Sequence, residues 1–193
     1  MNYFAQRYPS LISKIALHIT CTEKTKIELL QSVTHFYKFG IRQFVVIRGD
    51  GTIHANGFKY ASELVEVIRT NFLDVAIYVA GYPENDAELE FTNKKIELGV
   101  NACITQVCFD SKTIAKFRDN LKLPVLPGLV LPTEKSLDFS KKLGLALPTA
   151  DINDQSLFLR KQIEELIDNG FHHFHFYTLN NIDNLLYLFY DSI

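Results

Sequence analysis

QFVVIRGD (43–50) joins a continuously apolar run to an arginine, a glycine and an aspartate. An uninterrupted apolar run is typical of a strand that is covered on both faces, as strands of parallel sheets are. Similar β-prone runs lie on both sides of it, at KIALHIT (14–20) and at DVAIYVAGY (74–82). The stretches that separate the three runs have the spacing of amphipathic helices. Strands separated by helices predict βαβ units and a parallel sheet.

The alternation continues along the rest of the chain. Further strands are predicted at 102–107, 123–131 and 171–177, and helices at 24–39, 62–71, 86–98, 112–121, 135–143, 157–169 and 182–190. Within the first of these helices, Ile27, Leu30, Val33 and Tyr37 are predicted to share a face. About six βα units result, where a complete (β/α)₈ barrel has eight.

The predicted fold class is therefore α/β, a parallel (β/α) barrel of the TIM type that lacks its first two βα units. No GxGxxG motif follows the first strand, which argues against a dinucleotide-binding doubly wound sheet. We find no linker or composition shift that would divide the chain, and we expect residues 1–193 to form a single incomplete barrel domain.

Composition excludes several classes of protein. The chain of 193 residues is 47% hydrophobic and 22% charged, with a net charge of −2. It lacks the basic excess of a nucleic-acid-binding protein and any apolar run long enough to cross a bilayer. Three cysteines, Cys21, Cys103 and Cys108, are too few for a disulfide framework. We expect a cytoplasmic protein that binds neither nucleic acid nor membranes.

Polar residues gather where the predicted strands end. They are His18, Thr20, Arg48, Asp50, Tyr82, Glu84, Gln106, Tyr177 and Asn180. Active sites of barrels lie at the carboxyl ends of the strands, so these residues are the candidates for a site. At a barrel mouth, Asp50 could stabilise positive charge or tune a cofactor. The alternatives are that His18 is a core histidine and that Arg48 and Asp50 form a solvated pair in a tight turn.

Metal and cysteine chemistry have weaker support. His173 and His175 have a spacing found in metal sites, but no third ligand is obviously placed, and we expect no metal. Neither Cys21 nor Cys108 lies in a glycine-rich elbow of the kind that activates a nucleophile. The pair Lys94-Lys95 would ordinarily be solvated, although near a strand end it could neutralise a pyrophosphate.

A series of short motifs is more specific. LHITC (17–21), GIRQFVVIRGD (40–50), AGYPE (80–84), Thr105-Gln106, Phe109-Asp110, Pro127-Gly128 and HFYTLN (175–180) occur in one order. This series resembles the methylenetetrahydrofolate reductases, flavoenzymes built on a (β/α)₈ barrel. The resemblance implies bound FAD, NAD(P)H as the hydride donor, and reduction of 5,10-methylenetetrahydrofolate to 5-methyltetrahydrofolate for methionine synthesis.

The resemblance also implies a set of site residues. The FAD site would contain His18, Arg48, Gly49, Asp50, Tyr60, Ala61, Tyr82, Lys94 and Lys95. The folate site would contain Asp50, Gln106 and Tyr177, with Gln106 also contacting the nicotinamide. Asp50 would be the catalytic residue, because its charge favours the cationic iminium form of the substrate.

The chain also departs from the family pattern. We find no match for the glutamate of the family's first strand, which acts as the general acid on folate. Asp86 and Asn181 stand where the family usually has a histidine and an arginine. These departures leave open a non-catalytic relative that binds flavin or serves assembly, or one half of a split enzyme. Unpaired sheet edges at 14–20 and 171–177 predict a homo-oligomer or a partner chain.

Overall fold

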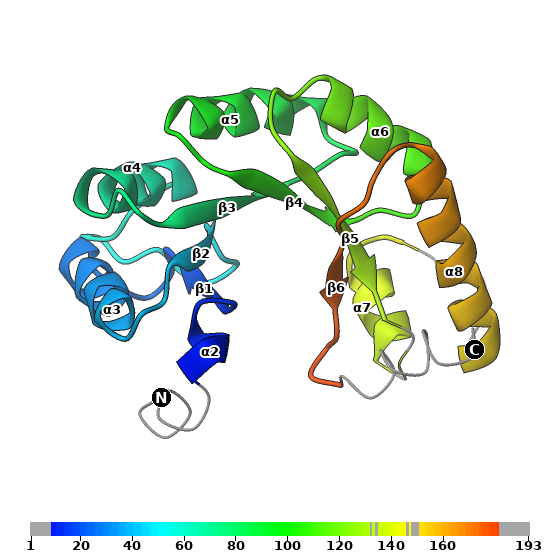
Figure 1. The fold of residues 1–193 in the computed structure, drawn as a ribbon, viewed down its shortest axis with the longest axis horizontal. Coiled ribbons are helices and arrows are strands. Elements are labelled where there is room, and N and C mark those ends of the chain that lie inside the picture. The colour runs from blue at the N-terminus through cyan, green and yellow to red at the C-terminus, as the bar shows by residue number, and fades with distance from the viewer. Residues whose placement is uncertain (1–8, 132, 134, 146, 148–150, 182–193) are drawn as a thin grey trace. The chain divides into compact units, whose positions relative to one another are not determined.

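The computed structural model describes residues 9–131, 133, 135–145, 147 and 151–181. Within them, six strands form one parallel sheet in the order β1-β2-β3-β4-β5-β6, which is also their order in the chain (Figure 1). The strands are β1 (Ala16–Thr20), β2 (Gln43–Ile47), β3 (Ala76–Gly81), β4 (Ala102–Val107), β5 (Val125–Val130) and β6 (His175–Tyr177). The prediction of a parallel sheet of consecutive βα units, as in a (β/α) barrel, is confirmed.

Helices separate the strands as the sequence predicted. They are α2 (Pro9–Ile12), α3 (Lys26–Lys38), α4 (Ala61–Asn71), α5 (Asp86–Glu97), α6 (Ser111–Asp119), α7 (Ser136–Lys142) and α8 (Ile152–Asp168). The short helix α2 was not predicted. The helix predicted at 182–190 lies outside the described residues.

The chain divides into two compact units. The first comprises Met1–Gly81 and Ala87–Cys103, and the second comprises Tyr82–Asp86 and Ile104–Ile193. Each unit has a part of the sheet and its own helices.

In the first unit, the two faces of the sheet have different surroundings. The register pairs Ala16 with Gln43 and His18 with Val45, and it pairs Val45 with Tyr78, so these side chains share one face. That face is mostly exposed or half-buried. The opposite face is buried and packs against helices; its core comprises Phe44, Val46, Ile77 and Val79 from the strands and Leu29, Val33, Leu64, Val65 and Ile68 from α3 and α4.

The face that Ile27, Leu30, Val33 and Tyr37 were predicted to share is not the buried face of α3. Val33 is buried, but 69% of Ile27 is exposed, and the second buried residue is Leu29. Leu29 and Val33 are four residues apart and so lie on the same face, from which Ile27 points away. The helix begins at a capping box, in which Glu28 N–H donates to Thr25 Oγ1 and Thr25 N–H donates to Glu28 Oε2.

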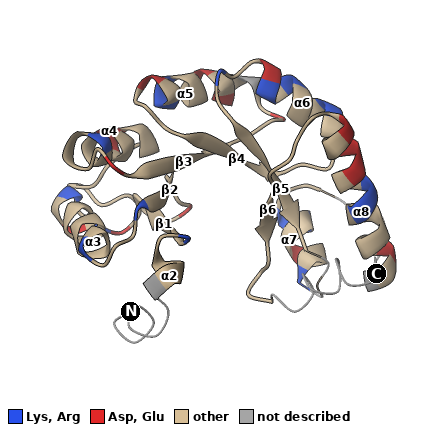
Figure 2. Cartoon of the chain, viewed as in Figure 1, with Lys and Arg blue, Asp and Glu red and all other residues tan. Residues whose placement is uncertain are grey.

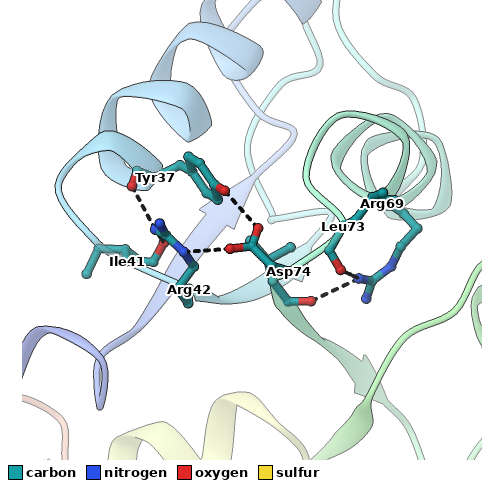
Figure 3. Close-up of polar contacts among 7 residues, drawn as sticks. Tyr37, Ile41, Arg42, Arg69, Leu73 and Asp74 are labelled. Carbon is teal, nitrogen blue, oxygen red and sulfur yellow. Dashed lines mark hydrogen bonds and ion pairs between the residues drawn. The ribbon is translucent and has the colours of Figure 1, made fainter.

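Two arginines bind the segments where strands of this unit begin (Figure 3). Arg42 Nε lies 3.0 Å from Asp74 Oδ2, and the Tyr37 hydroxyl donates to Asp74 Oδ1 at 2.8 Å. The Arg69 guanidinium donates to the carbonyls of Val75 and Gly99 at 2.9 and 2.8 Å. These bonds satisfy backbone carbonyls that precede β3 and β4.

The second unit packs α6 and α8 together on the remaining strands. Its buried side chains include Ile114, Leu129, Leu131 and Leu166. Helix α8 begins five residues before the predicted start, because Asp151 accepts from Asn153 N–H at 2.8 Å and from Asp154 N–H at 3.3 Å. This side-chain cap fixes the helix start ahead of its apolar positions.

Charged side chains lie on the helices and connecting segments, whereas the strands carry none (Figure 2). This distribution agrees with a sheet whose strands supply most of the core. Among the described residues, no helix has the length and apolar character required to span a membrane.

Candidate functional site

In the first unit, β1 and β2 end beside one another with polar side chains. His18 lies on the same face as Thr20, as predicted, and remains exposed to solvent. Partial burial nevertheless lowers the pKa of His18 below its usual value, so the imidazole is neutral at neutral pH. In the loop that follows β1, the Thr22 hydroxyl donates a hydrogen bond to Thr20 Oγ1 at 3.1 Å.

Arg48, Gly49 and Asp50 follow β2 directly. Gly49 has a φ of +81°, which favours glycine. A Cβ on Gly49 would lie 3.0 Å from Thr22 Cγ2, so the loop packs tightly on the end of β1. Arg48 donates to the Gly49 carbonyl at 3.2 Å, and no ion pair joins it to Asp50 in the described part of the chain. Both charged side chains are exposed.

Tyr60 and Ala61 lie at the start of α4. Tyr60 is the residue that precedes the helix and is 47% exposed, whereas Ala61 is buried in the first turn. Glu63 accepts the backbone N–H groups of Lys59 at 2.6 Å and Tyr60 at 3.0 Å, which fixes this turn. The aromatic ring of Tyr60 is thereby held at the surface of the first unit.

The two adjacent lysines of α5 have different environments. Lys94 is exposed and pairs with Glu90 at 2.9 Å. Lys95 is half-buried, and its Nζ donates to the Ala80 carbonyl at 3.3 Å, near the end of β3. Burial lowers the pKa of Lys95, while the nearby Cys103 and Glu88 oppose that shift. Of the predicted basic pair, Lys95 is therefore the cation at a strand end.

In the second unit, Tyr82 and Gln106 line one cavity of about 240 Å³. The other lining residues are Pro83, Glu84, Asn85, Val107 and Leu143. An aromatic ring and a proline supply flat apolar surface, and the Gln106 amide both donates and accepts hydrogen bonds. This combination suits a flat heterocycle that has donors and acceptors along its edge. No sequence pattern indicated Leu143, which lines the cavity from the end of α7.

Glu84 lies between this cavity and a buried cysteine. Cys108 Sγ is 3.8 Å from Glu84 Oε1, and burial raises the pKa of the Cys108 thiol to about 11. Burial likewise raises the pKa of Cys21 to about 11 and that of Cys103 to about 12. All three cysteines are free and fully buried. Such thiols are protonated at neutral pH and poor nucleophiles, which argues against cysteine catalysis.

Tyr177, at the end of β6, does not line the cavity that Gln106 lines. Its hydroxyl donates to the Thr105 carbonyl at 3.1 Å, so it binds the residue before Gln106. Asp110, part of another family motif, is the N-cap of α6 and accepts from Lys112 N–H at 3.1 Å. These two residues thus have structural contacts that their motifs did not reveal.

Metal binding gains no support from the described residues. Among them, no group of three or more His, Cys, Asp or Glu side chains is placed to hold a metal ion. His173 is exposed, and the His175 ring stacks edge-on against the Tyr177 ring, with 4.7 Å between centroids.

Comparison with known proteins agrees with the motifs at these strand ends. The sequence profile of the methylenetetrahydrofolate reductase family matches residues 10–154, which include β1 to β5. The chain belongs to the methylenetetrahydrofolate reductase family. The family resemblance predicted from the sequence is thus confirmed, and with it membership of a family of oxidoreductases.

Individual members of the family match over most of the chain. The 5,10-methylenetetrahydrofolate reductase of Buchnera aphidicola subsp. Schizaphis graminum is 30% identical over 87% of this chain and 67% of its own length. The enzyme of that name from Escherichia coli K12 is 29% identical over 87% of this chain and 66% of its own length. Methylenetetrahydrofolate reductase 1 of Schizosaccharomyces pombe is 26% identical over 85% of this chain and 33% of its own length.

Solved structures match less closely. Oxaloacetate acetylhydrolase gives a TM-score of 0.45 at 13% identity, covering 79% of this chain and 59% of that chain. This similarity is too low to support any inference about function.

Proposed function

We propose that the protein binds FAD and uses NAD(P)H to reduce 5,10-methylenetetrahydrofolate to 5-methyltetrahydrofolate, a methyl donor for methionine synthesis. The observation that carries the proposal is the family match over residues 10–154, which includes the strand-end residues Arg48, Gly49, Asp50 and Gln106. FAD, when bound, accepts a hydride from the nicotinamide and delivers it to the methylene carbon of the folate.

The residues of the first unit fit a flavin. Lys95 presents a half-buried ammonium at the end of β3, and its lowered pKa reflects the cost of desolvating that charge. A bound pyrophosphate would offset the cost by pairing with the ammonium. Gly49 has no side chain and lets a flat ring approach the backbone of the loop after β2. Arg48, His18, Tyr60, Ala61 and Lys94 are the further flavin residues of the proposal, together with Tyr82 of the second unit.

Asp50 and Gln106 are the proposed substrate residues. Asp50 is exposed at the end of β2 and has no partner among the described residues. Its negative charge would stabilise the cationic iminium form of the folate, which accepts the hydride. Gln106, in the cavity of the second unit, would bind donor and acceptor atoms of the pterin edge and then of the nicotinamide.

The proposal is tested with the purified full chain in anaerobic flavin spectroscopy. FAD is added, bound flavin is separated from free flavin, and NADH and NADPH are mixed in turn with the complex. We expect bleaching of the flavin absorbance band by the nicotinamide and its recovery on addition of 5,10-methylenetetrahydrofolate. Binding of FMN with no binding of FAD, or bleaching with no recovery by the folate, contradicts the proposed reaction.

We also propose that the protein acts as a homo-oligomer or with a partner chain in the cytoplasm. Within the described part of the chain, β1 and β6 each have one neighbouring strand, and unpaired strand edges favour association. The three free cysteines support a reducing compartment. Sedimentation at low micromolar concentration tests the assembly, and a compact, cooperatively unfolding monomer contradicts it.

A further inference from the structure

Three residues of the second unit link β4, β5 and β6 immediately before Gln106. The Tyr177 hydroxyl donates to the Thr105 carbonyl oxygen at 3.1 Å. The buried Gly128 N–H donates to Thr105 Oγ1 at 2.8 Å. Thr105 of β4 is thus held by β5 through its side chain and by β6 through its carbonyl. We call these three residues the Thr105 clamp.

Gly128 leaves the space that the Thr105 clamp needs. A Cβ at this position would lie 2.1 Å from the Thr105 carbonyl oxygen and 2.8 Å from Tyr177 Cε2. The φ of Gly128 is not positive, so the glycine is required by space and not by backbone conformation. This accounts for the glycine of the Pro127-Gly128 motif, for which the proposed function supplies no role.

The ring of Tyr177 is held on two sides. The His175 ring contacts it edge-on with 4.7 Å between centroids, and the Phe139 ring of α7 lies at 6.1 Å. In the β5–β6 register Tyr177 pairs with Val130, two residues beyond Gly128, so its ring leans back over the glycine. The hydroxyl is therefore fixed at Thr105 by packing as well as by its hydrogen bond.

We infer that Tyr177 is a positioning residue that sets the orientation of Gln106 through the Thr105 carbonyl. This carbonyl belongs to the planar peptide bond that joins Thr105 to Gln106. The orientation of that peptide plane sets the direction in which the Gln106 side chain projects from β4. A phenol hydroxyl can donate one hydrogen bond, and here the Thr105 carbonyl oxygen accepts it. The inference rests on the proposed function and replaces the direct substrate contact predicted for Tyr177.

The test is a double-mutant cycle of Tyr177→Phe and Gln106→Ala, read by calorimetric titration with 5-methyltetrahydrofolate. In the wild-type background, loss of the hydroxyl should weaken folate binding by about threefold to tenfold, the worth of one hydrogen bond. In the Gln106→Ala background it should have no further effect, because there is no longer a glutamine to position. Equal weakening in both backgrounds, or none in either, overturns the inference.

A matched control removes a hydroxyl elsewhere. Tyr78 donates to Gln43 Oε1 at 2.9 Å in the first unit, so Tyr78→Phe also deletes one hydroxyl hydrogen bond. This variant should bind folate as the wild type does. If it weakens binding as much as Tyr177→Phe, the effect is general loosening of the fold and the inference is wrong.

A second measurement needs no ligand and separates the inference from the proposed function. In ¹⁵N-labelled protein, Tyr177→Phe should shift the side-chain amide signals of Gln106 and accelerate hydrogen exchange of the Gly128 N–H, whereas Tyr78→Phe should do neither. Unchanged Gln106 signals overturn the inference even if folate binds. If wild-type protein binds no folate but the Gln106 signals shift, the proposed function fails and the positioning role stands.

Discussion

At the beginnings of β2 and β3 in the first unit, charged side chains bind other parts of the protein, whereas the charged side chains just beyond the end of β2 face solvent. Arg42 and Asp74 pair with one another and with Tyr37 (Figure 3). Arg69 binds backbone carbonyls of two segments. Beyond β2, Arg48 donates a hydrogen bond to the adjacent Gly49 carbonyl, and Asp50 has no hydrogen-bond or ion-pair partner among the described residues.

We infer that polar residues at the beginnings of these strands stabilise the fold, whereas those beyond β2 are available for binding and catalysis. Polar groups bonded within the protein hold strands and connections in place, but they have little capacity left for a ligand. The exposed charges beyond β2 contribute little to folding and remain available. Barrel enzymes in general carry their sites at the carboxyl ends of the strands. Substitutions at the two ends should therefore affect different measurements.

The largest expected effect on stability is that of Arg69→Met. The substitution removes the guanidinium that bonds to Val75, Gly99 and Asn101. Since it leaves these acceptors without their charged donor, we expect a loss of about 2–4 kcal/mol in the free energy of unfolding, measured by urea denaturation. The matched control is Arg48→Met, which should change it by less than about 0.5 kcal/mol. Equal losses of unfolding free energy in the two variants would contradict the conclusion that Arg69 stabilises the fold and Arg48 does not.

Asp50→Asn should lower activity and leave stability nearly unchanged, which is the reverse of the effect expected for Arg69→Met. Removing the charge that favours the iminium form should lower turnover by about a hundredfold, a typical cost of losing one electrostatic contact to a transition state. The exposed position predicts a change in unfolding free energy below about 0.5 kcal/mol. Steady-state kinetics per bound flavin and urea denaturation measure the two quantities. Loss of flavin with unchanged turnover per bound flavin would show that Asp50 only holds the cofactor.

Lys95→Met should separate binding from stability at one residue. Loss of a charge-assisted contact to the pyrophosphate should weaken FAD binding by roughly tenfold or more. Burial disfavours the Lys95 ammonium, so the same variant should be at least as stable as the wild type at neutral pH. Lys94→Met is the control: Lys94 is exposed and pairs with Glu90, and it should affect FAD binding less. Equal effects of the two lysines would contradict the assignment of Lys95 as the strand-end cation.

The smallest expected effect is the pH dependence contributed by His18. Its pKa is lowered in the folded protein, so the unfolded state binds more protons as the pH falls below the ordinary value of 6.5. The contribution of His18 to stability is therefore present above that value and is lost at lower pH. Urea midpoints of wild type and His18→Gln at about pH 7.5 and about pH 5.5 should show a smaller decrease in the variant. A larger decrease in the variant would mean that burial does not lower the pKa of His18.

The order of the elements was predictable because it depends on local patterns. Apolar runs predicted every described strand, and helical spacing predicted each longer helix between them. Errors arose where a side-chain contact or packing overrides the pattern. Asp151 starts α8 early, and α3 buries Leu29, which the spacing did not include in the face predicted to contain Ile27. The spacing of apolar residues predicts that a helix has an apolar face. Packing against the sheet determines which of its residues are buried.

For the candidate site, the family and the residues at the strand ends, including Asp50 and Gln106, could be read from sequence motifs. Motif order is preserved in the chain whatever its packing, so the resemblance could be read without coordinates. The coordinates were needed to show that Lys95 and not Lys94 lies at the end of β3, and that Tyr177 bonds to Thr105. The two lysines are adjacent in the sequence, and their side chains leave α5 in different directions. The Tyr177 contact spans 72 positions of the chain. Such contacts depend on how helices and strands pack, which no local spacing records.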